Sequence, residues 1–276
     1  MLTRLRALLL STHPGPSVAV TLVAVGLALG LHLEGWRVVL IGFAFVFNQF
    51  SVGLSNDWID ADRDRDVGRT DKPVALGLVS AELVRNAAFV CFATALLLTV
   101  PLGWPAILAH FVFIASAWTY NAALKNTWFS VVPYIVSFGL LPMIVTLALP
   151  PPAMAAPWTL GLGALLGIAA HFANVLPDLD DDASTGIAGL PHRIGRRASG
   201  VVIWAVLAVA GLLAFFGQPG EKTVIQWVGV LLTLVLAAAI AVALRRPPTR
   251  LLFQLIIAAA LVNVVVLAFA GQRLLA

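Results

Sequence analysis

The chain has 276 residues, of which 61% are hydrophobic and only 11% are charged, and its mean hydropathy is +0.98. About a quarter of the residues of a soluble domain are charged, so this composition excludes a soluble globular protein and indicates a chain that sits in lipid. The net charge of +4 does not indicate a nucleic-acid partner, because the sequence has no soluble face on which basic residues gather.

Apolar stretches that approach the length of a bilayer-crossing helix, about 20 residues, recur along the whole chain. In chain order they cover residues 17–33, 38–54, 87–100, 106–120, 131–149, 160–176, 201–216, 224–244 and 252–270. The sequence therefore predicts an all-α, polytopic membrane protein. We expect a bundle of nine transmembrane helices in a single domain over residues 1–276.

The basic residues predict the orientation of this bundle, because Lys and Arg accumulate in cytoplasmic loops. If the amino terminus is cytoplasmic, all 17 basic residues except Arg37, Lys222 and Arg273 fall on the cytoplasmic side. A single miscounted helix would destroy this asymmetry. The helix count and the orientation therefore support each other.

Most of the 13 acidic residues lie in two loops, one after the second predicted helix and one after the sixth. Four helices separate the loops, so both emerge on the cytoplasmic side. An asparagine, Asn56 or Asn174, precedes each acidic segment, which suggests an internal duplication of helices 1–4 and 5–8. The acids are Asp57, Asp60, Asp62, Asp64, Asp66 and Asp71 in the first loop, and Asp178, Asp180, Asp181 and Asp182 in the second.

The spacing of the acids predicts which of them act together. On a helix that continues past the membrane face, Asp57, Asp60 and Asp64 point one way. Asp62 and Asp66 point the other way, and we expect them to pair with Arg63, Arg65 or Arg69 in solvent. In the second segment, one helical stripe holds Asn174, Asp178, Asp181 and Asp182.

Carboxylates crowded on one stripe repel one another unless a cation neutralises them. Magnesium fits best, because it is typically held by one or two carboxylates together with substrate phosphates. A single acidic loop would be interpreted as a solvated surface segment, but two loops with the same pattern favour a metal-binding site. The predicted ligands are Asp57, Asp60, Asp64, Asp178, Asp181 and Asp182.

At these residues the sequence resembles the UbiA superfamily of intramembrane prenyltransferases. The family's first motif, N-D-x-x-D-x-x-x-D, matches Asn56, Asp57, Asp60 and Asp64, and its second, D-x-x-x-D, matches Asp178 and Asp182. The likeness extends over nearly the whole chain and includes Lys72-Pro73 and the segment 120–125. It departs from many relatives after the second motif, where residues 183–189 carry no Lys or Arg.

The resemblance implies a magnesium-dependent enzyme that transfers a prenyl group from a polyprenyl diphosphate to a small, aromatic or quinone-precursor acceptor among membrane lipids. The prenyl tail would lie in an apolar tunnel or a lateral opening among the helices. The implied catalytic residues are Asp57, Asp60, Asp64, Asp178 and Asp182. The implied substrate-binding residues are Asn56, Arg69, Lys72, Tyr120, Lys125, Asn174 and Arg193.

Other interpretations stay open at this point. A membrane terpene cyclase of the same superfamily would quench the cation within its own chain, and a transporter would use the acidic clusters as a cation gate. His13, His32 and His192 are expected at the surface. His110 and His171 fall within predicted helices, where each is either a structural residue or a base at an acceptor site.

Overall fold

The computed structural model describes residues 2–176, 179, 188–244 and 250–276, and most of these are helical. No β-strand occurs among them. The α-helices are α1 (Leu2–Leu10), α2 (Pro14–Gly30), α3 (Gly35–Ile59), α4 (Ala61–Asp66), α5 (Ala81–Thr99), α6 (Trp104–Thr119), α7 (Val132–Leu147), α8 (Pro157–Val175), α10 (Leu190–Phe216), α11 (Val224–Ala243) and α12 (Arg250–Ala268). Shorter turns are η1 (Val100–Leu102), η2 (Tyr120–Leu124) and η3 (Gly271–Leu274).

Each of the nine apolar stretches overlaps one of these helices, and the prediction of an all-helical membrane protein is confirmed. Within the described ranges, six helices are long and apolar enough to cross a membrane, namely α3, α5 with η1, α6 with η2, α8, α10 and α11. The α1–α2 pair, bent by 58°, would make a seventh, whereas α7 and the apolar part of α12 are shorter. The count of nine spans therefore stays a prediction.

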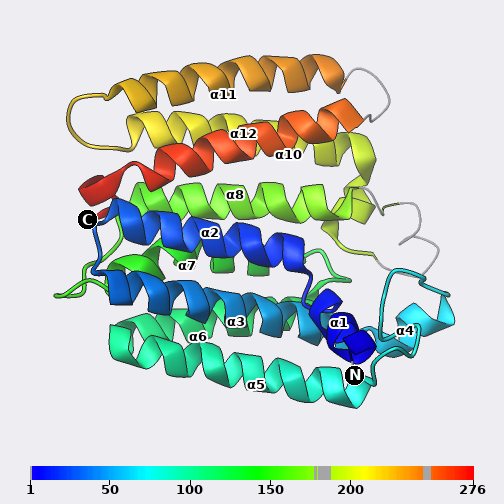
Figure 1. Ribbon diagram of the computed structural model, residues 1–276. Helices are drawn as coiled ribbons and strands as arrows, with labels where there is room; N and C mark the ends of the chain where they lie inside the picture. The colour runs from blue at the N-terminus through cyan, green and yellow to red at the C-terminus, as the bar shows by residue number, and fades with distance from the viewer. Residues whose placement is uncertain (1, 177–178, 180–187, 245–249) are drawn as a thin grey trace.

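The long helices lie side by side in one bundle (Figure 1). Helix α3 packs against α2 and α5, α7 packs against α6 and α8, and α10 packs against α8 and α11. Helix α12 contacts both α11 and α2, so the last long helix closes the bundle against the first. Helices α1 and α4 lie together at one end of the bundle, and the carboxyl terminus lies at the other (Figure 1).

The acidic segment after α3 does not continue as one helix. Helix α3 ends at Ile59, Asp60 occupies the junction, and the six-residue α4 begins at Ala61. The prediction that one continuous helix carries Asp57, Asp60 and Asp64 is wrong in this respect. Aspartate is a poor helix former in a helix interior, which is consistent with a break where several acids follow one another.

Candidate active site

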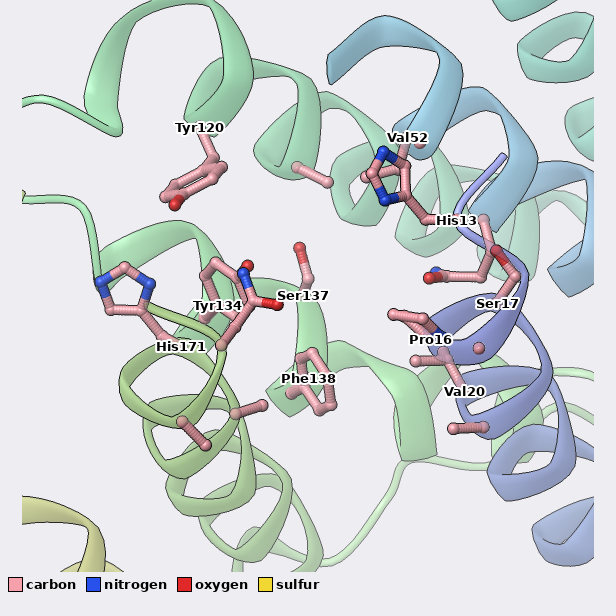
Figure 2. Close-up of a pocket in the computed structure, with 18 of the residues that line it drawn as sticks. His13, Pro16, Ser17, Val20, Val52, Tyr120, Tyr134, Ser137, Phe138 and His171 are labelled. Atoms are coloured by element: carbon pink, nitrogen blue, oxygen red, sulfur yellow. The ribbon is translucent and has the colours of Figure 1, made fainter. Parts of the chain in front are cut away.

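A cavity of about 1060 Å³ opens among α2, α3, α6, α7, α8 and α12, and it reaches the chain that follows α3. Figure 2 shows part of its wall, with His13, Pro16 and Val20 facing Tyr120, Tyr134 and His171 across the space. Its polar lining includes His13, Asn56, Asp60, Arg63, Asp64, Arg69, Lys72, Asn121, Lys125, His171, Asn174 and His192. Its apolar lining includes Val20, Leu22, Phe113, Leu141, Leu166, Ile257, Leu261 and Leu267.

Asp60 is the centre of the charged part of the cavity. Its side chain is only 7% exposed, and it forms ion pairs with Lys125 and with Arg63, whose Nη2 lies 2.9 Å from Oδ2. Asn56 Nδ2 donates to the same Oδ2 at 3.2 Å. Burial lowers the pKa of Lys125, and the carboxylate of Asp60 opposes that shift. The junction residue between α3 and α4 is thus held by two cations and an amide.

The backbone brings Lys125 to this position through a wide turn. Between Tyr120 and Leu124 the helix widens to π geometry, and the Lys125 N–H donates to the Tyr120 carbonyl at 3.0 Å. Asn121 fixes the turn to α3, because its Nδ2 donates to the Val52 carbonyl at 3.0 Å and to Ser55 Oγ at 2.8 Å. Such widened turns are frequent at functional sites.

Asp64 and Asp62 have opposite surroundings, as their spacing predicts. Asp64 is buried, lines the cavity and lies 3.2 Å from Arg63 Nη2. The side chain of Asp62 is 93% exposed and accepts from Arg65 Nη1 at 2.8 Å. Asp66 is also exposed. The separation of cavity-facing from solvent-facing acids is therefore confirmed for this part of the segment.

Asp57 is placed differently from Asp60 and Asp64. Its side chain is 1% exposed, and it does not belong to the described lining of the cavity. Lys72 Nζ lies 2.5 Å and His13 Nε2 lies 2.9 Å from Asp57 Oδ1, while Oδ2 is buried without a hydrogen-bond partner among the described residues. Lys72 also donates to Asn56 Oδ1 at 3.2 Å, so it binds the first two residues of the N-D-x-x-D motif.

His13 is a site residue that the sequence interpretation missed. Its side chain is 39% exposed, as expected of a surface histidine, but it also lines the cavity and bonds to Asp57 across 44 positions of the chain. It occupies the bend between α1 and α2 with φ of 51°, a left-handed conformation. The Pro14-Gly15-Pro16 run marks this bend in the sequence, but it does not reveal the distant partner. His192 lines the cavity as well.

Arg69 lies at the cavity and carries its own counter-ion. Its Nε and Nη2 donate to the two carboxylate oxygens of Asp71, each at 2.8 Å. The hydrogen bonds from Arg69 lower the pKa of Asp71 to about 2, so this carboxylate stays ionised at any ordinary pH. These two bonds orient the Arg69 guanidinium, which lines the cavity.

Arg193 does not belong to the described lining of the cavity. Its side chain is exposed, its Nε donates to the Ala188 carbonyl at 2.6 Å, and its guanidinium lies 5.0 Å from the centre of the Trp128 ring. The geometry gives no support to the expectation that Arg193 contacts diphosphate.

Helix α8 brings the second motif toward the same cavity as far as the described chain extends. Asn174, in its last turn, lines the cavity together with His171 one turn earlier. The acids expected to ligate metal in this motif, Asp178, Asp181 and Asp182, lie outside the described residues. Their predicted role stays a prediction.

The donor set suits magnesium that shares its ligands with a substrate. Within the described chain, no three acidic, histidine or cysteine side chains converge closely enough to enclose a metal alone. Asp60 and Asp64 still offer hard carboxylate oxygens to the cavity, and Asp57, outside its lining, has a buried Oδ2 without a hydrogen-bond partner in the described chain. One or two carboxylates completed by phosphate oxygens and water are the usual magnesium environment in proteins.

A comparison of the chain with protein-family models identifies its family. The model of the UbiA prenyltransferase family matches residues 17–255. The chain belongs to the UbiA prenyltransferase family. No curated protein matches it significantly.

Solved UbiA structures share the fold of the whole chain at low sequence identity. A UbiA homolog from Archaeoglobus fulgidus bound to GPP and Mg²⁺ is 16% identical, with a TM-score of 0.72 over 96% of this chain and 98% of that one. An apo UbiA homolog from Aeropyrum pernix K1 is 20% identical, with a TM-score of 0.68 over 88% and 94%. A digeranylgeranylglyceryl phosphate synthase is 14% identical, with a TM-score of 0.69 over 98% and 99%.

Proposed function

We propose that this UbiA protein transfers a prenyl group from a polyprenyl diphosphate to a small aromatic or quinone-precursor acceptor within the membrane, and that the reaction requires magnesium. The observation that carries the proposal is the cavity, which joins buried carboxylates and cations to an extended apolar lining. An amphipathic substrate with a charged head and a hydrocarbon tail matches this division. Solved relatives bound to GPP or DMAPP with Mg²⁺ support the same substrate class.

The charged part of the cavity would hold the diphosphate. Magnesium, when bound, neutralises diphosphate oxygens and stabilises the leaving group. Asp57, Asp60 and Asp64 are its proposed ligands, with Asp178, Asp181 and Asp182 from the second motif. Lys72, Lys125 and Arg69 line the cavity and are the proposed cationic donors to phosphate oxygens, and Asn56 and Asn174 would add neutral donors.

Lys72 and Lys125 would assist the ionisation of the prenyl diphosphate. In that step the allylic carbon–oxygen bond breaks, and its electron pair leaves with the diphosphate. Donors already fixed where negative charge develops lower the barrier most, and the bonds of Lys72 to Asn56 and Asp57 and of Lys125 to Asp60 fix both ammonium groups. The acceptor then supplies an electron pair to the allylic carbon, forms the new bond and loses a proton.

The apolar walls would bind the tail and protect the cation. Burial of hydrocarbon contributes about 0.8 kcal/mol per methylene, so each added isoprene unit strengthens binding as long as the lining extends. Val20, Leu166 and Leu261 belong to this lining. A cavity closed to water at the reacting carbon also suppresses hydrolysis of the cation.

The test is a product assay with the purified protein in lipid nanodiscs. Labelled geranyl, farnesyl, geranylgeranyl and longer diphosphates are incubated with magnesium or EDTA, with and without para-hydroxybenzoate or dihydroxynaphthoate. We expect diphosphate release and a prenylated acceptor only when magnesium and an acceptor are both present. A cyclised hydrocarbon formed without acceptor would indicate a terpene cyclase instead, and no release from any diphosphate would contradict the proposal.

A further inference from the structure

Two histidines are buried among the helices, and they differ in their hydrogen bonding. His110, on α6, is fully buried, and both its ring nitrogens have partners, because Nε2 lies 2.7 Å from Asn48 Nδ2 and Nδ1 lies 2.8 Å from Thr99 Oγ1. Its ring also stacks on Phe45 at 5.0 Å, and it is not among the described residues that line the cavity. His110 is thus a satisfied structural residue.

His171, on α8, has only one nitrogen bonded. Its Nε2 lies 3.0 Å from Ser130 Oγ, whereas its Nδ1 is buried and has no hydrogen-bond partner among the described residues. The residue is 1% exposed and belongs to the lining of the cavity. An unpaired buried polar atom costs about 1–3 kcal/mol, so a native site that keeps one usually has a use for it.

The surroundings of Ser130 determine which ring nitrogen of His171 carries the proton. Ser130 Oγ already accepts the Leu190 N–H at 2.9 Å, and among the described residues His171 Nε2, 3.0 Å away, is the partner within reach of its own hydroxyl proton. If Nε2 were protonated, a buried hydroxyl proton and a buried Nδ1 lone pair would both be left unpaired. The arrangement with fewer unpaired groups makes Nε2 the acceptor and leaves Nδ1–H as a free donor.

Aromatic rings lie close to the His171 ring. The Tyr134 ring lies 4.8 Å and the Tyr120 ring 5.7 Å from the His171 ring, measured between centroids. Phe138 stacks on Tyr134 at 6.2 Å. Figure 2 shows Tyr120, Tyr134 and His171 grouped on one side of the space, opposite His13 and Val20. A planar ring is the shape that such a wall accommodates, because offset and edge contacts stabilise aromatic neighbours.

We propose that His171 positions the acceptor, with Nδ1–H donating a hydrogen bond to a carboxylate, phenol or carbonyl oxygen of a flat aromatic molecule packed against Tyr134 and Phe138. The inference rests on the proposed prenyl transfer and names the acceptor's side of the same cavity. Asn174 lies one turn further along α8, toward the motif that would hold the diphosphate. His171 would therefore hold the acceptor on the side of the reacting carbon that faces away from the diphosphate.

The decisive variants separate the two ring nitrogens. In His171→Asn the side-chain amide nitrogen takes the place of Nδ1. In His171→Gln, which has the longer side chain, the amide nitrogen takes the place of Nε2. We expect His171→Gln to raise the acceptor KM by about tenfold, since a lost bond to a charged oxygen has at least that effect. We expect the acceptor KM of His171→Asn to stay within about threefold of the wild-type value. In both variants the KM for geranyl diphosphate should stay within about twofold of the wild-type value. The acceptor probes are para-hydroxybenzoate and dihydroxynaphthoate.

Nitrogen-15 NMR of labelled histidine gives a readout that needs no turnover. His171 is expected as the Nδ1–H tautomer, with a resonance that shifts when either probe is added, while the His110 resonance stays unchanged. His110→Gln serves as the control for general effects of replacing a buried histidine. Equal acceptor KM values in wild type and His171→Gln would overturn the inference and leave prenyl transfer intact. Turnover of a probe without any shift of the His171 resonance would overturn it as well. A wild type that neither prenylates a probe nor releases diphosphate would contradict prenyl transfer itself.

Discussion

Asp60 and Asp62 lie two positions apart in one acidic segment, and the structure gives them different environments. Asp60 is buried at the cavity between Lys125 and Arg63, and Asp62 is in solvent beside Arg65. We expect Asp60→Ala to lower kcat/KM by at least about 100-fold, since it removes a charge that organises the diphosphate site. The kcat/KM of Asp62→Ala should stay within about twofold of the wild-type value, because an exposed ion pair contributes little to stability.

Diphosphate release at saturating magnesium measures both variants. Each is first checked by size-exclusion chromatography for the elution volume of the wild type. An equal loss of activity in the two variants would mean that the whole segment acts as a charged surface, and the assignment of Asp60 to the site would be wrong.

Lys72 offers a test of stability at the same scale. Its ammonium faces the 1%-exposed Asp57, so Lys72→Met would leave a buried carboxylate with His13 as its remaining partner. Breaking a buried pair in this way costs about 3–5 kcal/mol. Arg65→Met removes the partner of exposed Asp62 and should cost less than about 1 kcal/mol. Thermal unfolding in detergent compares the two, and a similar Tm for both variants would contradict the buried pairing.

The residue spacing predicts only part of this site. Three- and four-residue spacing was sufficient to separate Asp64 from Asp62, because local helical geometry decides that difference. It could not pair Asp57 with Lys72 and with His13, which lies at a bend far along the chain. Nor could it place Arg193 outside the described lining of the cavity, since that depends on contacts with Ala188 and Trp128. Contacts between distant segments carry this information, and periodicity does not report them.

At the scale of helices, the contact between α7 and α8 sets the shape of the aromatic wall. Gly163 and Gly167, one turn apart on α8, face the backbone of α7, and a Cβ at Gly163 would lie 3.0 Å from the Phe138 carbonyl carbon. A Cβ at Gly167 would lie 2.9 Å from the Tyr134 carbonyl carbon. Small residues at this spacing allow two membrane helices to approach closely. The close approach holds Tyr134 beside His171.

We expect Gly167→Ala to force the two helices apart and to destabilise the protein by about 1–3 kcal/mol, as overpacking does elsewhere. Gly161→Ala is the matched control on the same helix, since its Cβ would meet only the flexible end of Leu213 at 3.1 Å. Thermal unfolding and acceptor KM are measured for both variants. A Gly167→Ala protein with wild-type Tm would show that the interface is more adaptable than its geometry indicates.

Hydropathy predicts the helices well and their interruptions poorly. All nine apolar stretches coincide with helices, because burial in lipid requires long runs of apolar residues with satisfied backbone groups. The short α1, the break at Asp60 and the π turn at residues 120–124 were not predicted. Each depends on a few local hydrogen bonds and on the neighbouring helices. These interruptions are also the features that bring His13, Asp60 and Lys125 to the cavity.

At the scale of the whole molecule, the closed bundle separates its two ends. The acidic segment and α1 lie at one end, and the turn between α10 and α11 lies at the other, with α5, α6, α7, α8 and α10 between residues 66 and 221 in the chain (Figure 1). If all five cross the membrane, Asp66 and Glu221 lie on opposite sides. The distribution of Lys and Arg further predicts that the Asp66 side is cytoplasmic.

Single cysteines test both statements in a Cys91→Ala background, because Cys91 is the one cysteine of the sequence. Asp66 and Glu221 are exposed, and neither contributes to the site, so Asp66→Cys and Glu221→Cys should retain activity. We expect a membrane-impermeant maleimide to label Glu221→Cys in intact cells and Asp66→Cys only after permeabilisation. The reverse pattern would invert the orientation. Labelling of both on one side would mean that one helix between them does not cross, and the short α7 would be the first to examine, because at 16 residues it is shorter than a bilayer requires.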